Sequence, residues 1–124
     1  MKSALFAAVA VLLSTSAIAE PVIPPFSPME GKWTVDLRPS LDAAPYSQPM
    51  EISVKADKSV TGAFYNSEIL AGKAVVARGR SCIAFRTTDG SGFYHSSACL
   101  IDGKMIGTTW AEGRGFLFPW TAER

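Results

Sequence analysis

Short runs of alternating apolar and polar residues dominate the chain beyond residue 30, and clusters of turn-forming residues separate these runs. Alternation with a period of two is typical of strands that bury one face. No long window carries apolar residues at the i, i+3, i+4 and i+7 positions of an amphipathic helix. We expect strands over eight ranges: 32–38, 50–55, 60–65, 70–77, 81–88, 93–101, 104–110 and 116–122. Short strands with turns roughly every 8–15 residues predict an all-β sandwich or barrel.

The turns between the last four predicted strands determine a pairing register. A four-residue loop at 89–92 places Cys82 directly opposite Cys99. Directly opposed residues bring their Cβ atoms close enough for a disulfide. The Asp-Gly pair at 102–103 favours a two-residue hairpin turn, which sets the register of the next strand pair.

The same register separates the side chains of this four-strand meander into two faces. It opposes Ala111 to Phe116 and places Trp120 over Gly107, a large side chain over a small one. The inward face, which we expect to be core, holds Ile83, Phe85, Tyr94, Ala98, Leu100, Met105, Phe116, Phe118 and Trp120. The outward face holds Arg86, His95, Ser97, Lys104, Thr108, Glu123 and the disulfide. A slip of one residue would mix the two faces, so the clean separation supports the register.

Residues 1–19 have the composition of a secretory signal peptide. Lys2 precedes an unbroken apolar run over 4–13, and the small residues Ala17 and Ala19 form a cleavage site. A membrane-spanning helix is the alternative, but this run is too short to cross a hydrocarbon layer of roughly 30 Å. We therefore expect an exported protein, periplasmic or secreted, with no membrane insertion.

The segment 20–30 contains four prolines, which favour an extended chain without a hydrogen-bonded ladder. We expect it to be a Pro-rich leader in front of a single β-barrel domain over 31–124. It is either a disordered spacer or a functional segment.

Composition narrows the classes of function. The formal net charge is +1 and the basic residues are not clustered, so nothing favours nucleic-acid binding. The two cysteines belong to a chain bound for an oxidising compartment, where a disulfide is the expected state. With one histidine besides, they fall short of a structural zinc set, and we expect neither a metal site nor another cofactor.

A Gly-x-Trp motif (Gly31, Lys32, Trp33) opens the first predicted strand, and a basic residue, Arg124 or Arg114, lies near the end of the last. Together with eight strands in simple order, this pattern resembles the calycins, the group of lipocalins and avidins. The C-terminal segment 113–124 also looks like the ending of small exported bacterial proteins of unknown function. The resemblance implies a single up-and-down antiparallel β-barrel, in which Trp33 closes one end and the basic side chain packs over its ring.

The resemblance does not extend to biotin binding. The segment 60–64 is similar to the third strand of avidins. However, the two positions of the first strand that carry polar groups in avidins are Val35 and Pro39 here, and the third strand ends in Phe64-Tyr65-Asn66 where avidins have Tyr-x-Ser.

A few hydroxyl groups in an apolar cup are typical of a small-molecule pocket. We expect a non-enzymatic binding module in which a small apolar ligand lies against aromatic residues while hydroxyl groups orient its polar end. The predicted ligand-binding residues are Trp33, Phe85, Tyr94, Ser96, Thr109, Phe118 and Trp120. The alternative is a filled core in which Thr87, Ser96 and Thr109 bond one another or water.

Two other functions stay open. The chain resembles in plan the periplasmic inhibitors of alkaline metalloproteases, barrels whose N-terminal segment enters the protease cleft. In those inhibitors the disulfide lies in the first half of the barrel, whereas Cys82 and Cys99 lie in the second. The outward residues Ile106, Trp110, Leu117 and Pro119 could bind a protein partner or a second copy of the chain.

An enzyme is the weakest hypothesis. His95 is the single histidine. Ser97 is the next outward residue on the same strand, but the sequence places no acid clearly beside the histidine.

Overall fold

The computed structural model describes residues 25–124, so the predicted signal peptide and the first residues of the leader lie outside the described part. A short 3-10 helix, η1 (Ser27–Met29), precedes the strands. The strands are β1 (Gly31–Asp36), β2 (Ser47–Val54), β3 (Ser59–Phe64), β4 (Ser67–Glu68), β5 (Leu70–Ala77), β6 (Arg80–Thr88), β7 (Phe93–Ile101), β8 (Lys104–Ala111) and β9 (Phe116–Glu123). Over this range, no helix has the length and apolar character needed to cross a membrane.

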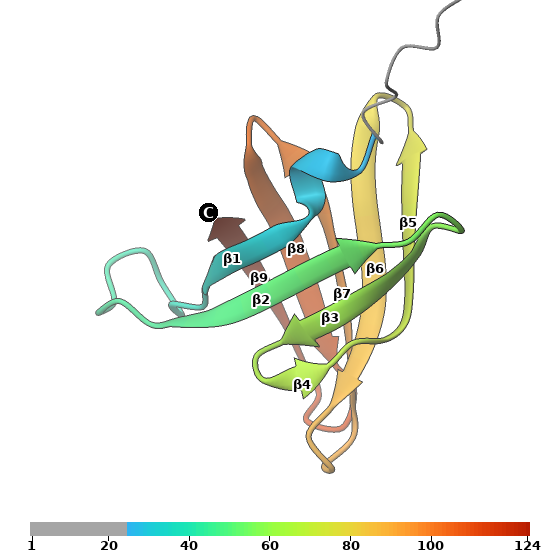
Figure 1. Cartoon of the computed structure of the whole chain (residues 1–124). Helices are drawn as coiled ribbons and strands as arrows, with labels where there is room; N and C mark the ends of the chain where they lie inside the picture. The colour runs from blue at the N-terminus through green and yellow to red at the C-terminus, as the bar shows by residue number, and fades with distance from the viewer. Residues whose placement is uncertain (1–24) are drawn as a thin grey trace, which may run out of the picture.

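Eight antiparallel strands close into a barrel (Figure 1). The hydrogen-bonded order is β2-β1-β9-β8-β7-β6-β5-β3, and pairing of β2 with β3 completes the ring. The short strand β4 pairs only with β3. The predicted all-β, up-and-down barrel is therefore confirmed, and its architecture is consistent with a calycin-like fold. Each of the eight ring strands pairs with a neighbour on both sides, although β1 with β9 and β3 with β5 pair over only a few residues.

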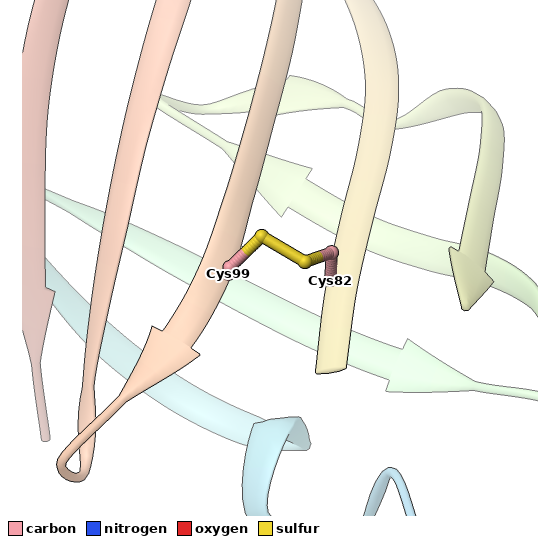
Figure 2. Close-up of a disulfide and its surroundings, with 2 residues drawn as sticks. All are labelled: Cys82 and Cys99. Carbon is pink, nitrogen blue, oxygen red and sulfur yellow. A yellow bond between two sulfur atoms is a disulfide. The ribbon is translucent and has the colours of Figure 1, made fainter. Parts of the chain in front are cut away.

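The predicted register of the second half is confirmed. Cys82 pairs with Cys99 across β6 and β7, and their disulfide joins the two strands (Figure 2). Gly107 pairs with Ala98 on one side and with Trp120 on the other. A Cβ atom at Gly107 would lie 2.6 Å from the Trp120 ring, so the glycine is what admits the indole.

The first half differs from the expectation around β4. The chain reverses at Tyr65 and Asn66, whose φ angles are 54° and 66°. Two positive φ angles in succession match the twist of the strands that such a turn joins. Asn adopts this conformation readily, but Tyr does so rarely, so the sequence carries only half of the usual turn signal.

One end of the barrel, here called the closed end, is plugged by η1 and its neighbours. Phe26 and Met29 are buried, so the last residues of the predicted leader belong to the core instead of extending away from it. The Trp33 indole N–H donates to the Met29 carbonyl at 2.9 Å. The Arg124 guanidinium lies 4.3 Å from the centre of the Trp33 ring and donates to the Pro28 carbonyl. The predicted closure by Trp33 under a terminal basic residue is confirmed, and that residue is Arg124.

Candidate functional site

A cavity of about 560 Å³ opens at the end of the barrel opposite η1, here called the open end. Its wall takes residues from the loop after β1, the β3–β4 turn and the β6–β7 and β8–β9 loops. The last two loops lie at the bottom of Figure 1, at the end of the barrel away from η1. The apolar part of its wall comes from Leu37, Phe64, Phe116, Phe118 and Trp120. The remaining wall consists of Tyr46, Tyr65, Asn66, Ser67, Thr87, Asp89, Tyr94, Thr109 and Arg114. The volume lies in the range of small-molecule sites.

The floor of the cavity is an aromatic cluster. The Phe64 and Trp120 ring centres lie 5.3 Å apart, and Phe85 packs on the other side of Phe64 at 5.5 Å. These tilted arrangements are favourable for aromatic pairs. Since Phe64 and Trp120 line the cavity and Phe85 does not, the floor lies between Phe85 and any ligand.

Three buried polar groups, two from wall residues and one from Ser96 behind them, satisfy one another. The Ser96 and Thr109 hydroxyls are hydrogen-bonded at 2.7 Å, and the Trp120 indole N–H donates to the Thr109 hydroxyl oxygen at 2.8 Å. The network fixes the orientation of the Trp120 ring. It also engages two of the three hydroxyls, those of Ser96 and Thr109, that the sequence suggested together with Tyr94 for orienting a ligand.

A charged cluster forms the rim where the β6–β7 loop meets the β8–β9 loop. Asp89 Oδ1 accepts the Ser91 backbone N–H at 2.9 Å. Asp89 Oδ2 accepts the Tyr94 hydroxyl at 2.8 Å and an Arg114 guanidinium N–H at 3.2 Å. The Ser91 N–H and then the Tyr94 hydroxyl hold the pKa of Asp89 below its ordinary value. Burial, and then the bond to Asp89, raise the pKa of Tyr94.

Two further tyrosines belong to the rim. Tyr46 ends the long loop before β2, and Tyr65 lies in the β3–β4 turn. Their hydroxyls are hydrogen-bonded to each other, a contact that raises the pKa of Tyr65. All three tyrosines of the chain therefore surround one cavity. Tyr suits such a position because its ring is apolar and its hydroxyl reaches water.

The contribution of Asp89 to stability is expected to depend on pH. A carboxyl group whose pKa is lowered by folding stabilises the folded state fully above its unfolded value, here 3.8. That contribution disappears as the pH falls through the folded pKa. The difference in free energy of unfolding between the parent and Asp89→Asn, from urea titrations, should be constant above pH 5 and shrink below pH 4. The other acids are common to both proteins and cancel. A difference that grows on acidification would contradict the assignment.

Four of the predicted ligand-binding residues line the cavity: Tyr94, Thr109, Phe118 and Trp120. The other three do not. Trp33 lies at the closed end, Phe85 lies behind the floor, and Ser96 is buried beneath Thr109. The period of two correctly predicted that these residues point inward. It carries no information on how far along the barrel axis each one lies, or on which large rings, such as that of Trp120, separate it from the cavity.

Sequence reasoning overlooked the loop residues of the wall. Tyr46, Tyr65, Asp89 and Arg114 lie in loops or turns, where alternation carries no information. A usable signal was present, since all three tyrosines are close to turns. Phe116, which we expected in the core, is 43% exposed because it lies at the rim.

The outer face of the barrel carries the predicted polar residues, with one partner that the sequence did not identify. His95 Nε2 lies 2.8 Å from Glu112 Oε1, but none of the described hydroxyl groups forms a hydrogen bond with this histidine. The apolar residues Ile106, Trp110, Leu117 and Pro119 are exposed, and Leu117 reaches 65%. A protein partner or a homodimer at this face stays a prediction.

Comparisons of the chain with protein-family models, curated proteins and solved structures give no match. Within residues 25–124, no three His, Cys, Asp or Glu side chains gather into a metal-ligand set. The cavity is therefore the feature of the described residues that points to a function.

Proposed function

We propose that this chain is an exported, non-enzymatic binding module that encloses one small apolar molecule at the open end of its barrel. The cavity of about 560 Å³, with its aromatic floor, carries the proposal. Barrels of eight strands either fill with side chains or hold one small ligand, and this barrel has a cavity of ligand size at its open end. The calycin-like architecture agrees with this role, although a shared fold does not establish a shared function.

The division of the barrel into two ends supports the proposal. The closed end is sealed by Phe26, Met29 and Trp33, which are all buried. The open end is bordered by loops, where binding residues are commonly found on a rigid scaffold. Export is supported by the Cys82–Cys99 disulfide, since such bonds persist mainly outside the reducing cytosol.

Native mass spectrometry of the mature protein, purified gently from its own host, tests the proposal. We expect an adduct of reproducible mass that is lost on unfolding. Thr87→Phe should abolish the adduct, because the added ring occupies the cavity that the Thr87 side chain lines.

The matched control is Thr108→Phe, which makes the same change on the exposed face of β8. It should keep the adduct, and circular dichroism should show both variants folded. A bare chain in the parent, or an adduct that survives Thr87→Phe in a folded protein, would contradict a ligand held in this cavity.

An inhibitor acting through the leader is less well supported. Phe26 and Met29 are committed to the core, so they are not available to enter a protease cleft. A truncation that tests this alternative should end at Pro25, because removing Phe26 would also open the closed end.

A further inference from the structure

The wall of the cavity is unusually rich in aromatic rings. Seven of its fourteen residues are aromatic. Three lie on the inside, Phe64, Phe118 and Trp120, and four lie around the rim, Tyr46, Tyr65, Tyr94 and Phe116. Aromatic rings prefer offset-stacked and edge-to-face contacts with other rings, contacts that an aliphatic chain cannot supply. The wall therefore favours a ring system over a flexible chain.

The charges at the cavity are already balanced. Asp89 and Arg114 are the two charged residues of the wall, and they are paired with each other. Both Asp89 oxygens accept hydrogen bonds from protein groups. An ionised ligand would enter the aromatic interior without an unpaired counter-charge, and burying an uncompensated charge is costly.

Of the three buried hydroxyl residues in the described part of the chain, Thr87, Ser96 and Thr109, Thr87 is the one without a protein partner, while the half-buried Ser67 of β4 also leaves its hydroxyl unpaired in the wall. Thr87 is only 3% exposed and lines the cavity, opposite Tyr94 in the β6–β7 register. Its hydroxyl forms none of the side-chain hydrogen bonds within residues 25–124, whereas those of Ser96, Thr109 and Tyr94 are all engaged. It is not sealed either, since Arg86 Nε is the one described side-chain atom both buried and unpaired. The hydroxyl is therefore available to a molecule inside the cavity.

We infer that the cavity selects an uncharged aromatic molecule with one hydrogen-bonding group that pairs with the Thr87 hydroxyl. This inference rests on the proposed function and specifies its ligand class. Each part has its own cause: the rings favour an aromatic body, the balanced rim disfavours a charge, and Thr87 favours a single buried polar group. A buried polar group is expected to find a partner, which here is the ligand.

Four compounds of nearly one shape separate these causes. They are 2-naphthol, naphthalene without the hydroxyl, naphthalene-2-sulfonate with a charge, and decahydro-2-naphthol without the aromatic system. Equilibrium dialysis against the full mature protein gives a dissociation constant for each. We expect 2-naphthol to bind about fivefold more tightly than its decahydro analogue. We expect it to bind at least about tenfold more tightly than the sulfonate.

Thr87→Val tests the hydrogen bond, because it replaces the hydroxyl with a methyl group of similar shape. It should weaken 2-naphthol binding by roughly five- to tenfold and leave naphthalene binding unchanged. Thr108→Val, the same change on the outer face, should alter neither. Since the Thr87 hydroxyl has no protein partner, the variant should unfold at the same urea concentration as the parent or a higher one.

The outcomes distinguish the inference from the proposed function. If decahydro-2-naphthol or the sulfonate binds best, the cavity is a binding site and the inferred ligand class is wrong. If Thr87→Val weakens the binding of naphthalene and of 2-naphthol equally, the inferred hydrogen bond between the ligand and the Thr87 hydroxyl is wrong. If none of the four compounds binds, the inferred ligand class is wrong, and the adduct experiment with Thr87→Phe decides the proposed function separately.

Discussion

Replacing Cys82 and Cys99 together with alanine is expected to lower the free energy of unfolding by about 3 kcal/mol. The disulfide closes a loop whose ends are 17 residues apart. Without the disulfide the unfolded chain has more conformational entropy. For a loop of that length, this entropy lowers the free energy of the unfolded state by about 3 kcal/mol. A domain of this size has a stability of only about 5–15 kcal/mol, so the loss would be a large fraction of the total. Urea titration followed by tryptophan fluorescence measures it.

Two comparisons separate this effect from simple loss of packing. Reducing the parent protein should produce the same loss as the double variant, since both open the same loop. Ser97→Ala, an outward change two residues from Cys99, should alter the free energy by less than about 0.5 kcal/mol. A loss below about 1 kcal/mol in the double variant would show that the hairpin turn already restrains this part of the unfolded chain.

The position of that disulfide could be predicted because the second half of the barrel consists of consecutive hairpins. The Asp-Gly turn at 102–103 has φ angles of 51° and 82°, the conformation that its residues favour. Once a turn is placed, a period of two assigns every side chain in its hairpin to a face. That is why Trp120 could be placed over Gly107 before the structure was known.

The first half was less predictable because its chain reversals lack such signals. Tyr65 has a positive φ angle that its side chain does not favour, and the register of β5 shifts between Leu70 and Lys73. Such positions depend on tertiary contacts. At Tyr65, one such contact is the hydrogen bond between its hydroxyl and that of Tyr46. Contacts between residues distant in sequence leave no local pattern to detect.

The candidate site was predictable only in part, for a related reason. The alternation predicts which residues point inward, and it correctly included Tyr94, Thr109, Phe118 and Trp120. It does not indicate that Phe85 packs behind Phe64, outside the cavity, nor which hydroxyls bond one another. Because Ser96 and Thr109 satisfy each other, the available hydroxyl is that of Thr87, which depends on three-dimensional packing.

Truncating Trp33 to alanine is expected to cost about 3–5 kcal/mol, because it removes a fully buried indole from the closed end. Trp33→Phe should cost only about 1–2 kcal/mol. It keeps a ring beneath Arg124 but leaves the Met29 carbonyl without its indole donor. Urea titrations of both variants beside the parent measure these costs. A cost for Trp33→Ala no greater than that for Trp33→Phe would show that the closed end does not depend on the indole.

The same variant tests whether the two ends of the barrel have separate roles. The resemblance to calycins suggested Trp33 as a ligand contact, whereas the structure places it at the end opposite the cavity. Because Trp33 does not line the cavity, folded Trp33→Phe should bind 2-naphthol as tightly as the parent, while Phe118→Ala should bind it several-fold more weakly. If Trp33→Phe weakens binding as much as Phe118→Ala does, the ligand reaches the closed end and the division between plug and pocket is wrong.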